Sequence, residues 1–195
     1  MGTILYGNLR VEIVGGLGAR ADRLSVSGGP PSLIPRRFRA HEESTVPLLG
    51  RDEHISEAYA AAGSRRPIEF TATCGYGKST LLRHIAAHTV YDGLARSSVY
   101  LLAGPGGLHD LLQRLVAELF TSDPPVKPTP EQCAALLGQV RAVIMLDDVM
   151  LDPGQVDYLL RVLPGCSLVL GSPRPVLGRY GTSRILAGQI GRAHV

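Results

Sequence analysis

One short segment, TATCGYGKST, which begins at Thr71, brings glycine, lysine and hydroxyl side chains together. From Ala72 onward it matches the phosphate-binding pattern G-x-x-x-x-G-K-[ST], with alanine in place of the first glycine. Gly75 and Gly77 allow the backbone to turn several N–H groups toward one point, and a helix that begins near Lys78 adds the positive end of its dipole. The segment therefore predicts an anion-binding loop; the alternative is an ordinary turn with a solvated lysine.

The last three residues of this segment, Lys78, Ser79 and Thr80, have side chains that could hold a polyphosphate and its cation. Lys78 would lie across the β and γ phosphates of a nucleotide. The Ser79 hydroxyl would complete the coordination shell of a Mg²⁺ ion, with Thr80 beside it. The loop thus predicts a nucleotide and Mg²⁺ as cofactors.

A second candidate is the acidic pair Asp147 and Asp148, which ends the apolar run VIMLDD. A parallel sheet would place both carboxylates at its carboxyl edge, where ligands bind. Because two carboxylates there are costly without a cation, we expect Asp147 to hold Mg²⁺ through water and Asp148 to polarise the attacking water. The alternative is a pair of helix-capping residues at the start of a loop.

Arg174 is the third candidate, because it follows the apolar run LVLGSP just past the next expected strand. A guanidinium at that position could reach the γ phosphate and report its presence. The alternative is a solvated arginine. Together with Lys78, Asp147 and Asp148 it forms the expected catalytic set.

The elements that must position these residues alternate along the chain. Strand patterns occupy 67–73, 97–103, 142–148 and 166–172, and helix patterns occupy 51–63, 78–90, 107–120, 131–140 and 153–163. Gly63 is expected to stop the first helix. The alternation predicts βαβ units and an α/β fold, a P-loop NTPase three-layer sandwich with a central parallel sheet.

Charge and composition divide the chain into two parts. The first 40 residues hold six arginines against Glu12 and Asp22, a net charge of +4, whereas the remainder holds 14 basic and 15 acidic residues, a net charge of −1. A nucleic-acid-binding face is therefore not expected on the domain. Residues 25–48 are rich in Pro, Gly, Ser and Arg, which is typical of an extended linker. We expect an arm and linker over 1–47 and a nucleotide-binding domain over 48–188.

Several other functions are disfavoured by residue counts and spacing. The three cysteines lack the number and spacing of a disulfide framework or a zinc site. His84 and His88 are expected to be surface or packing residues, because no third metal ligand is placed near them. No apolar run approaches the roughly 20 residues of a membrane span, and the N-terminus lacks a signal-peptide pattern. A cytoplasmic location without a membrane partner is expected.

Four segments in this order, LLGRDEHI, ATCGYGKSTLLRHIA, VIMLDDV and CSLVLGSPR, resemble the NB-ARC branch of the STAND signalling ATPases over roughly residues 48–187. The resemblance implies that Leu49 and Arg51 lie beside the adenine of ATP or ADP, and that Arg174 is the sensor arginine. The phosphate-binding residues that it implies are Cys74, Gly75, Tyr76, Gly77, Lys78, Ser79 and Thr80.

The resemblance also implies the function of a molecular switch. ADP would hold a closed form, exchange for ATP would open it for assembly, and slow Mg²⁺-dependent hydrolysis would reset it. The implied partners are the nucleotide, other domains of a longer parent protein and further copies in a homo-oligomer. Two other functions stay open: a P-loop phosphotransferase or motor ATPase, and a nucleotide-binding scaffold that does not hydrolyse.

The last seven residues, QIGRAHV, break the resemblance. They can be translated from CAG ATC GGA AGA GCA CAC GTC, which is a common sequencing-library adapter. The family's helical and winged-helix subdomains would come after this point. We therefore hypothesise that 189–195 is an artefactual tail, which a genomic reading frame that encodes these residues would refute.

Overall fold

The computed structural model describes residues 2–6, 9–13, 32–35, 48–91, 98–122 and 127–188. For the first three ranges and for residues 89–91 it describes the backbone alone. The tail expected at 189–195 lies outside the described residues, as does much of the arm and linker expected at 1–47.

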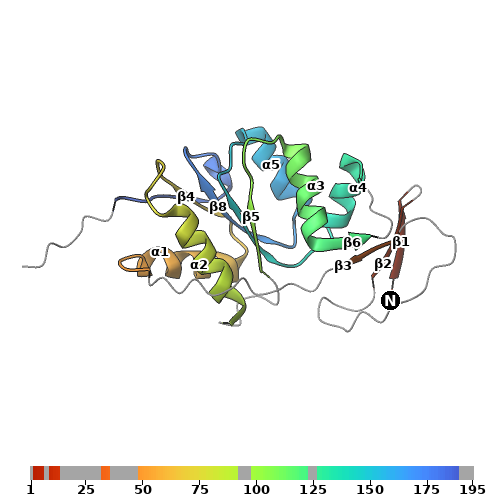
Figure 1. The fold of residues 1–195 in the computed structure, drawn as a ribbon, viewed down its shortest axis with the longest axis horizontal. Coiled ribbons are helices and arrows are strands. Elements are labelled where there is room, and N and C mark those ends of the chain that lie inside the picture. The colour runs from red at the N-terminus through yellow and green to blue at the C-terminus, as the bar shows by residue number, and fades with distance from the viewer. Residues whose placement is uncertain are drawn as a thin grey trace, which may run out of the picture.

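A five-stranded parallel sheet forms the centre of the domain (Figure 1). Its strands, in spatial order, are β5 (Ser98–Leu102), β7 (Val143–Asp147), β8 (Ser167–Ser172), β4 (Ile68–Thr71) and β9 (Thr182–Ile185). Every neighbouring pair is parallel. All five strands therefore end at the same edge of the sheet.

Helices cover both faces of this sheet (Figure 1). One layer consists of α1 (Asp52–Ser64) and α2 (Lys78–Tyr91). The other layer consists of α3 (Leu108–Leu119), α4 (Pro130–Leu137) and α5 (Pro153–Val162). The predicted three-layer α/β architecture with a central parallel sheet is confirmed.

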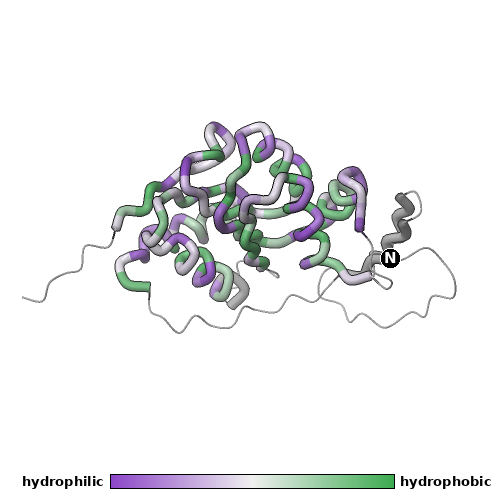
Figure 2. Tube along the Cα trace, turned by 45° about the horizontal axis from the view of Figure 1, so that its top comes forward, coloured by the Kyte–Doolittle hydropathy of each residue, from purple (hydrophilic) through white to green (hydrophobic). Residues whose placement is uncertain are grey.

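The apolar runs of the strands supply two cores at once. In β7, Val143 and Met145 join the cluster beneath α1 and α2, whereas Ile144 and Leu146 join the cluster beneath the other three helices. Successive side chains of a strand point to opposite faces, so a strand covered on both sides must be apolar throughout. Figure 2 shows these hydrophobic segments in green through the middle of the molecule.

The first helix ends later than the sequence predicts, and the expected glycine stop is wrong. Gly63 lies inside α1, and the residue that leaves the helix in the left-handed conformation is Arg65, at φ 54°. Pro67 comes two residues later, and it disfavours the helical region for Arg66, the residue before it. The proline, rather than the glycine, therefore sets where the chain turns toward β4.

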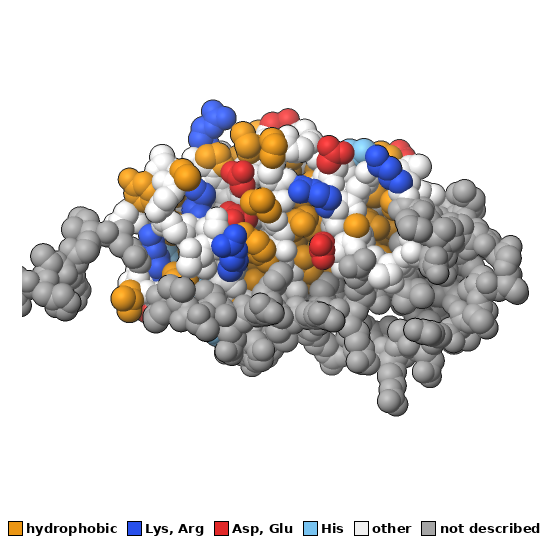
Figure 3. Space-filling model, viewed as in Figure 1, with side chains coloured by type: hydrophobic (Ala, Val, Ile, Leu, Met, Phe, Trp, Pro, Cys, Tyr) orange, Lys and Arg blue, Asp and Glu red, His pale blue; other side chains and the backbone are white. Residues whose placement is uncertain are grey.

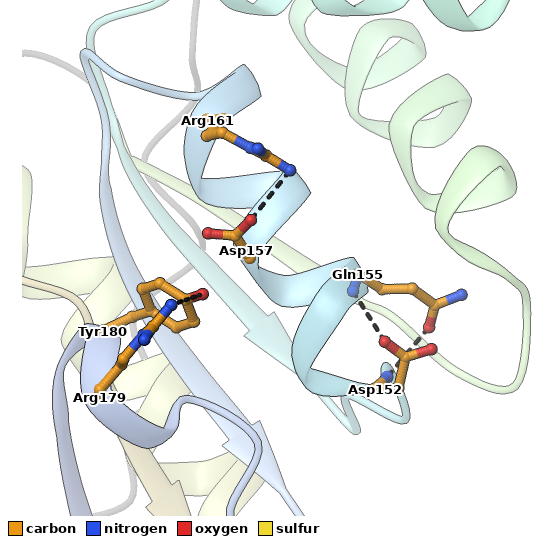
Figure 4. Close-up of polar contacts among 6 residues, drawn as sticks. All are labelled: Asp152, Gln155, Asp157, Arg161, Arg179 and Tyr180. Atoms are coloured by element: carbon orange, nitrogen blue, oxygen red, sulfur yellow. Dashed lines mark hydrogen bonds and ion pairs between the residues drawn. The ribbon is translucent and has the colours of Figure 1, made fainter.

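Capping boxes start α4 and α5. At α5 the Asp152 carboxylate accepts a hydrogen bond from the Gln155 amide at 2.8 Å, and the Gln155 side chain accepts one from the Asp152 N–H at 3.0 Å (Figure 4). Thr129 and Gln132 repeat this arrangement at α4. A proline in the first turn of each helix suits these starts. The α5 cap fixes where the loop after the acidic pair ends.

A second sheet joins the N-terminal region to the end of α3. Its order is β1 (Gly2–Tyr6), β2 (Leu9–Ile13), β3 (Ser32–Pro35) and β6 (Phe120–Ser122). β3 lies within the stretch expected to be an extended linker, and it pairs antiparallel with β6. Neither strand shows a pattern in the sequence, because each is only a few residues long and is defined by its pairing: β6 with β3, and β3 with both β6 and β2.

A short helical turn connects the last two strands of the central sheet. A 3₁₀ turn, Gly178–Tyr180, lies between β8 and β9, and the Arg179 guanidinium lies 5.3 Å from the centre of the Tyr180 ring (Figure 4). None of the described helices is long and apolar enough to cross a membrane.

Candidate functional site

The three candidate segments of the sequence follow three adjacent strands of the sheet. The glycine loop follows β4, Arg174 follows β8 and Asp147 is the last residue of β7. Because β8 lies between β4 and β7 and all three are parallel, these segments share the carboxyl edge. With neighbouring strands about 4.8 Å apart, the ends of β4 and β7 are roughly 10 Å apart, a span suited to a polyphosphate with its cation.

The loop takes its shape from two glycines in the left-handed region. Gly75 has φ 87° and Gly77 has φ 82°. A Cβ at either position would meet no atom within 4 Å, so space does not exclude a side chain. The requirement is conformational, because a residue with a Cβ is strained at these angles. The loop residues are exposed from Thr73 to Gly77.

The first turn of α2 faces the same loop. Its first helical hydrogen bond runs from the Leu81 N–H to the Gly77 carbonyl at 3.0 Å. The N–H groups of the residues before Leu81 precede the regular helical ladder and carry the positive end of the helix dipole. No acidic residue lies in this turn. The loop and helix together present donors to an anion.

Lys78 folds back onto its own loop. Its Nζ donates to the carbonyl of Ala72 at 2.5 Å and to the carbonyl of Thr73 at 3.2 Å. The ammonium group thus lies beside the first residues of the loop. It could exchange these neutral acceptors for phosphate oxygens by a side-chain rotation alone, and a charged acceptor makes the stronger hydrogen bond.

Arg51 is a buried tether for the loop, with 5% of its surface exposed. Its Nη2 donates to the carbonyl of Tyr76 at 3.0 Å and to the carbonyl of Ala187 at 2.9 Å. Gly188 lies against the Tyr76 ring, whose Cε1 would be 3.1 Å from a Cβ at that glycine. The guanidinium therefore fixes the glycine loop to the segment that follows β9, while Leu49 nearby in the chain is 76% exposed.

Asp147 is buried and its carboxylate oxygens are both occupied. The Tyr100 hydroxyl donates to Oδ2 at 2.7 Å, and the Asp148 N–H donates to Oδ1 at 2.9 Å. Burial, and after it the hydrogen bond to Asp147, raise the pKa of Tyr100 to about 12. The tyrosine was not among the residues predicted from the sequence, where it is one aromatic residue in an apolar strand. It keeps its proton and holds Asp147 in place.

The Asp147 carboxylate lies on the α2 side of the sheet. A Cβ built on Gly171 of β8 would lie 2.5 Å from Leu82 Cδ1 and 2.9 Å from Asp147 Oδ1. The position of this Cβ is thus close to both the second turn of α2 and the Asp147 carboxylate, so the helix and the carboxylate lie on the same face of the sheet. The sequence-predicted partners, the loop with its helix and Asp147, are brought together on one face.

Asp148 stands apart from its neighbour. It is exposed and its backbone is left-handed, at φ 55°. Asp and Asn tolerate this region better than most residues, at a cost of about 1 kcal/mol. The change of backbone direction after β7 separates the two side chains, so a buried acid and an exposed acid stand at consecutive positions.

Arg174 is exposed on the loop that follows β8 and is flanked by Pro173 and Pro175. The structure places it at the predicted edge of the sheet.

Figure 3 shows basic and acidic side chains interspersed with apolar ones on the viewed face of the described residues, without a continuous basic stripe there.

The residues at this edge fit a magnesium ion. Mg²⁺ prefers oxygen ligands and usually keeps several waters, taking one or two protein ligands and phosphate oxygens. Asp147 offers a buried carboxylate and Ser79 a half-buried hydroxyl in the first turn of α2. Within the described residues no cluster of three or more His, Cys, Asp or Glu side chains could hold a metal by itself. His84 and His88 stack on each other, with ring centroids 4.1 Å apart.

Comparison with known proteins shows distant structural similarity. No family model and no curated protein matches the chain. A solved DNA replication initiation factor is 19% identical, with a TM-score of 0.47 over 76% of this chain and 50% of that chain. DnaI is 18% identical, with a TM-score of 0.45 over 76% and 89% of the two chains.

A third structure, PCH-2 of C. elegans, is 14% identical, with a TM-score of 0.45 over 71% of this chain and 43% of that chain. The chain thus spans half or less of the PCH-2 and replication-factor structures. All three similarities have TM-scores below 0.5.

Proposed function

We propose that residues 48–188 form a nucleotide-binding domain that takes ATP and ADP with Mg²⁺ and hydrolyses ATP slowly. One observation carries the proposal: the exposed glycine loop with Lys78 and the buried carboxylate of Asp147 share one edge and one face of the sheet. Backbone N–H groups and an ammonium suit a polyphosphate, and a carboxylate beside them suits its divalent cation.

Each side chain has a distinct part in holding the nucleotide. The loop amides and the first turn of α2 would bind the phosphates, and Lys78 would turn from the Ala72 and Thr73 carbonyls to the β and γ oxygens. Ser79 would ligate Mg²⁺ directly and Asp147 through water, because both Asp147 oxygens already accept hydrogen bonds. The bound ion would neutralise charge on the phosphates.

The remaining acid and the arginine suit the hydrolytic step. Asp148 is exposed beside Asp147 and would polarise the attacking water. Arg174 would bind the γ phosphate and so distinguish ATP from ADP. The open loop admits water instead of excluding it, and an open site gains little from desolvation. Slow turnover is therefore expected.

The adenine is proposed to lie beside Leu49 and Tyr76, which are 76% and 41% exposed. A base stacked there would remove apolar surface from water. Arg51 would act on the base only indirectly, since its guanidinium is engaged with the Tyr76 and Ala187 carbonyls.

A switch of the STAND type is supported by the same tether. Arg51 links the phosphate loop to Ala187, in the segment that leads out of the domain after β9. A change in loop position on exchange of ADP for ATP would thus be transmitted to whatever follows in a longer protein. Other domains of that parent, and further copies in a homo-oligomer, are the proposed partners.

Lysine substitutions test nucleotide binding directly. The chain has only two lysines, Lys78 in the loop and Lys127, so Lys127 can serve as the matched control. We predict that Mg²⁺-ADP at 100 times its Kd stabilises the wild type by about 2.7 kcal/mol, or roughly 5–10 °C in Tm. Lys78→Ala should remove most of this shift. Lys127→Ala, an exposed residue beyond α3, should keep it. Thermal unfolding with and without nucleotide measures both.

An equal shift in Lys78→Ala and the wild type would refute the phosphate-loop assignment. Turnover separates the remaining functions: fast or substrate-stimulated hydrolysis would favour a phosphotransferase or motor ATPase, and binding with no hydrolysis at all would favour a scaffold.

A further inference from the structure

Glu69 is a buried carboxylate that the proposed function does not use. It lies in β4 between Ile68 and Phe70, with 0% of its surface exposed. Those two neighbours pack toward α1 and α2, so Glu69 points to the opposite face of the sheet. Burying a charged group is costly unless hydrogen bonds replace its water. The side chain therefore requires a specific set of partners.

Four donors meet this carboxylate. Oε1 accepts from the Leu177 N–H at 3.0 Å and from the Ser183 hydroxyl. Oε2 accepts from the Val176 N–H at 3.0 Å and from the Ser172 hydroxyl at 3.3 Å. Two of the donors are consecutive backbone amides, which can only donate, and each faces one oxygen. A carboxylate matches this pair, whereas an amide side chain has only one accepting atom.

The donors bracket the loop that carries Arg174. Ser172 ends β8 and Val176 stands just after Pro175, so both ends of this short loop are bound to one carboxylate. The prolines on either side of Arg174 fix their own φ angles and restrict the residues before them. Arg174 thus lies at the sheet edge on a stiff loop, and both ends of this loop are hydrogen-bonded to the Glu69 carboxylate.

The same strand leads directly into the phosphate loop. Glu69 precedes Ala72 by three residues, and the Ala72 carbonyl accepts from Lys78. The Ala72 N–H also binds the Ser172 carbonyl at 3.3 Å. A single carboxylate in β4 therefore sets the position of the Arg174 loop relative to the phosphate loop.

Resting on the proposed nucleotide-binding function, we propose that Glu69 is a positioning residue for Arg174. It touches no nucleotide, yet the preference of the site for a triphosphate over a diphosphate depends on it. Removing the second acceptor oxygen should free one end of the loop and let Arg174 move away from the γ phosphate.

The test is a double-mutant cycle on the ratio of two affinities. Dissociation constants for ADP and for a non-hydrolysable ATP analogue are measured, with Mg²⁺, in the wild type, Glu69→Gln, Arg174→Ala and the double variant. We expect Glu69→Gln to lower the triphosphate preference about tenfold while the ADP affinity changes less than about threefold. We expect the double variant to match Arg174→Ala, because the two residues act through one contact.

Glu57→Gln is the matched control. Glu57 also ties β9 to another element, since its carboxylate accepts from Arg184 at 2.7 and 2.8 Å, but it does not contact the Arg174 loop. Its substitution should leave the ratio unchanged. Ser172→Ala, which keeps Glu69 and removes the donor at the start of the loop, replaces Glu69→Gln if that variant fails to fold; it should lower the ratio in the same direction.

The outcomes separate this inference from the function beneath it. A ratio that Arg174→Ala lowers and that neither Glu69→Gln nor Ser172→Ala changes would overturn the positioning role alone. A ratio that Arg174→Ala leaves unchanged, or additive effects in the double variant, would overturn it too. A wild type that binds neither nucleotide would overturn the proposed function and, with it, this inference.

Discussion

Two consecutive acids in this chain have opposite surroundings, and the roles proposed for them follow from that difference. Asp147 is buried and accepts from Tyr100 and from the backbone, which fixes its position and suits a role in holding a cation through water. Asp148 is exposed on a left-handed backbone and can reach solvent. A residue meant to orient a reacting water needs that access.

Asp148→Asn is predicted to separate binding from turnover. The affinity for Mg²⁺-ADP should change less than about threefold, whereas ATP turnover should fall by about 10²-fold or more if the residue polarises the attacking water. Single-turnover hydrolysis and nucleotide titration measure the two quantities. Asp157→Asn, which alters an acid paired with Arg161 on α5, is the control. Unchanged turnover in Asp148→Asn would assign the activation of water to another group.

Tyr100 should make stability depend on pH at the alkaline end. Its folded pKa of about 12 lies above the ordinary 10, so the folded state holds the proton more tightly than the unfolded chain. This contribution is complete below pH 10 and is lost as the pH rises toward 12. We predict that the difference in unfolding free energy between wild type and Tyr100→Phe is constant near neutral pH and shrinks above about pH 10. Urea unfolding at each pH measures it, and a difference that persists to pH 12 would contradict the assignment.

At the scale of elements, Gly63 and Gly77 have similarly open surroundings but differ in whether their backbone conformation requires glycine. Neither Gly63 nor Gly77 would bring a Cβ within 4 Å of another atom. Gly77 is left-handed in the glycine loop, whereas Gly63 lies inside α1. Only Gly77 needs glycine for its conformation, because α1 continues through Gly63 to Ser64 and is capped by Arg65.

Gly63→Ala should therefore stabilise the protein by about 0.5–1 kcal/mol, or roughly 1–4 °C in Tm, since alanine costs less entropy inside a helix. Its nucleotide-dependent stabilisation should be unchanged. Gly77→Ala should fold and lose that stabilisation. Thermal unfolding of both variants measures this, and a lower Tm for Gly63→Ala would mean that the glycine does end the helix.

At the scale of the whole molecule, the features that could be predicted from the sequence are those with local causes. Continuous apolar runs such as VIML indicated strands covered on both faces, and the glycine loop between a strand and a helix indicated an anion site. Placing Lys78 and Asp147 at one edge required only that the strands be parallel. The sheet and its helices are confirmed, and the loop and the acids stand on the expected side.

What the sequence could not predict depends on contacts between distant residues. Glu69 binds Leu177 and Ser183, more than 100 positions away, and Arg51 binds Ala187 across 136 positions. β6 is a strand because it pairs with β3, and β3 pairs with both β6 and the distant β2. The one indication in the sequence was the charge of Glu69 inside an otherwise apolar strand, which requires buried partners without saying where they are.

The central claim is that Lys78 and Asp147 serve one bound Mg²⁺-nucleotide, and the Mg²⁺ dependence of ADP affinity tests it most directly. Calorimetric titration of ADP, with Mg²⁺ and with a chelator, should show that Mg²⁺ tightens binding to the wild type about tenfold or more. Asp147→Asn should remove most of that gain, whereas Asp148→Asn should keep it. Mg²⁺-independent binding by the wild type, or a full Mg²⁺ effect in Asp147→Asn, would contradict the shared site.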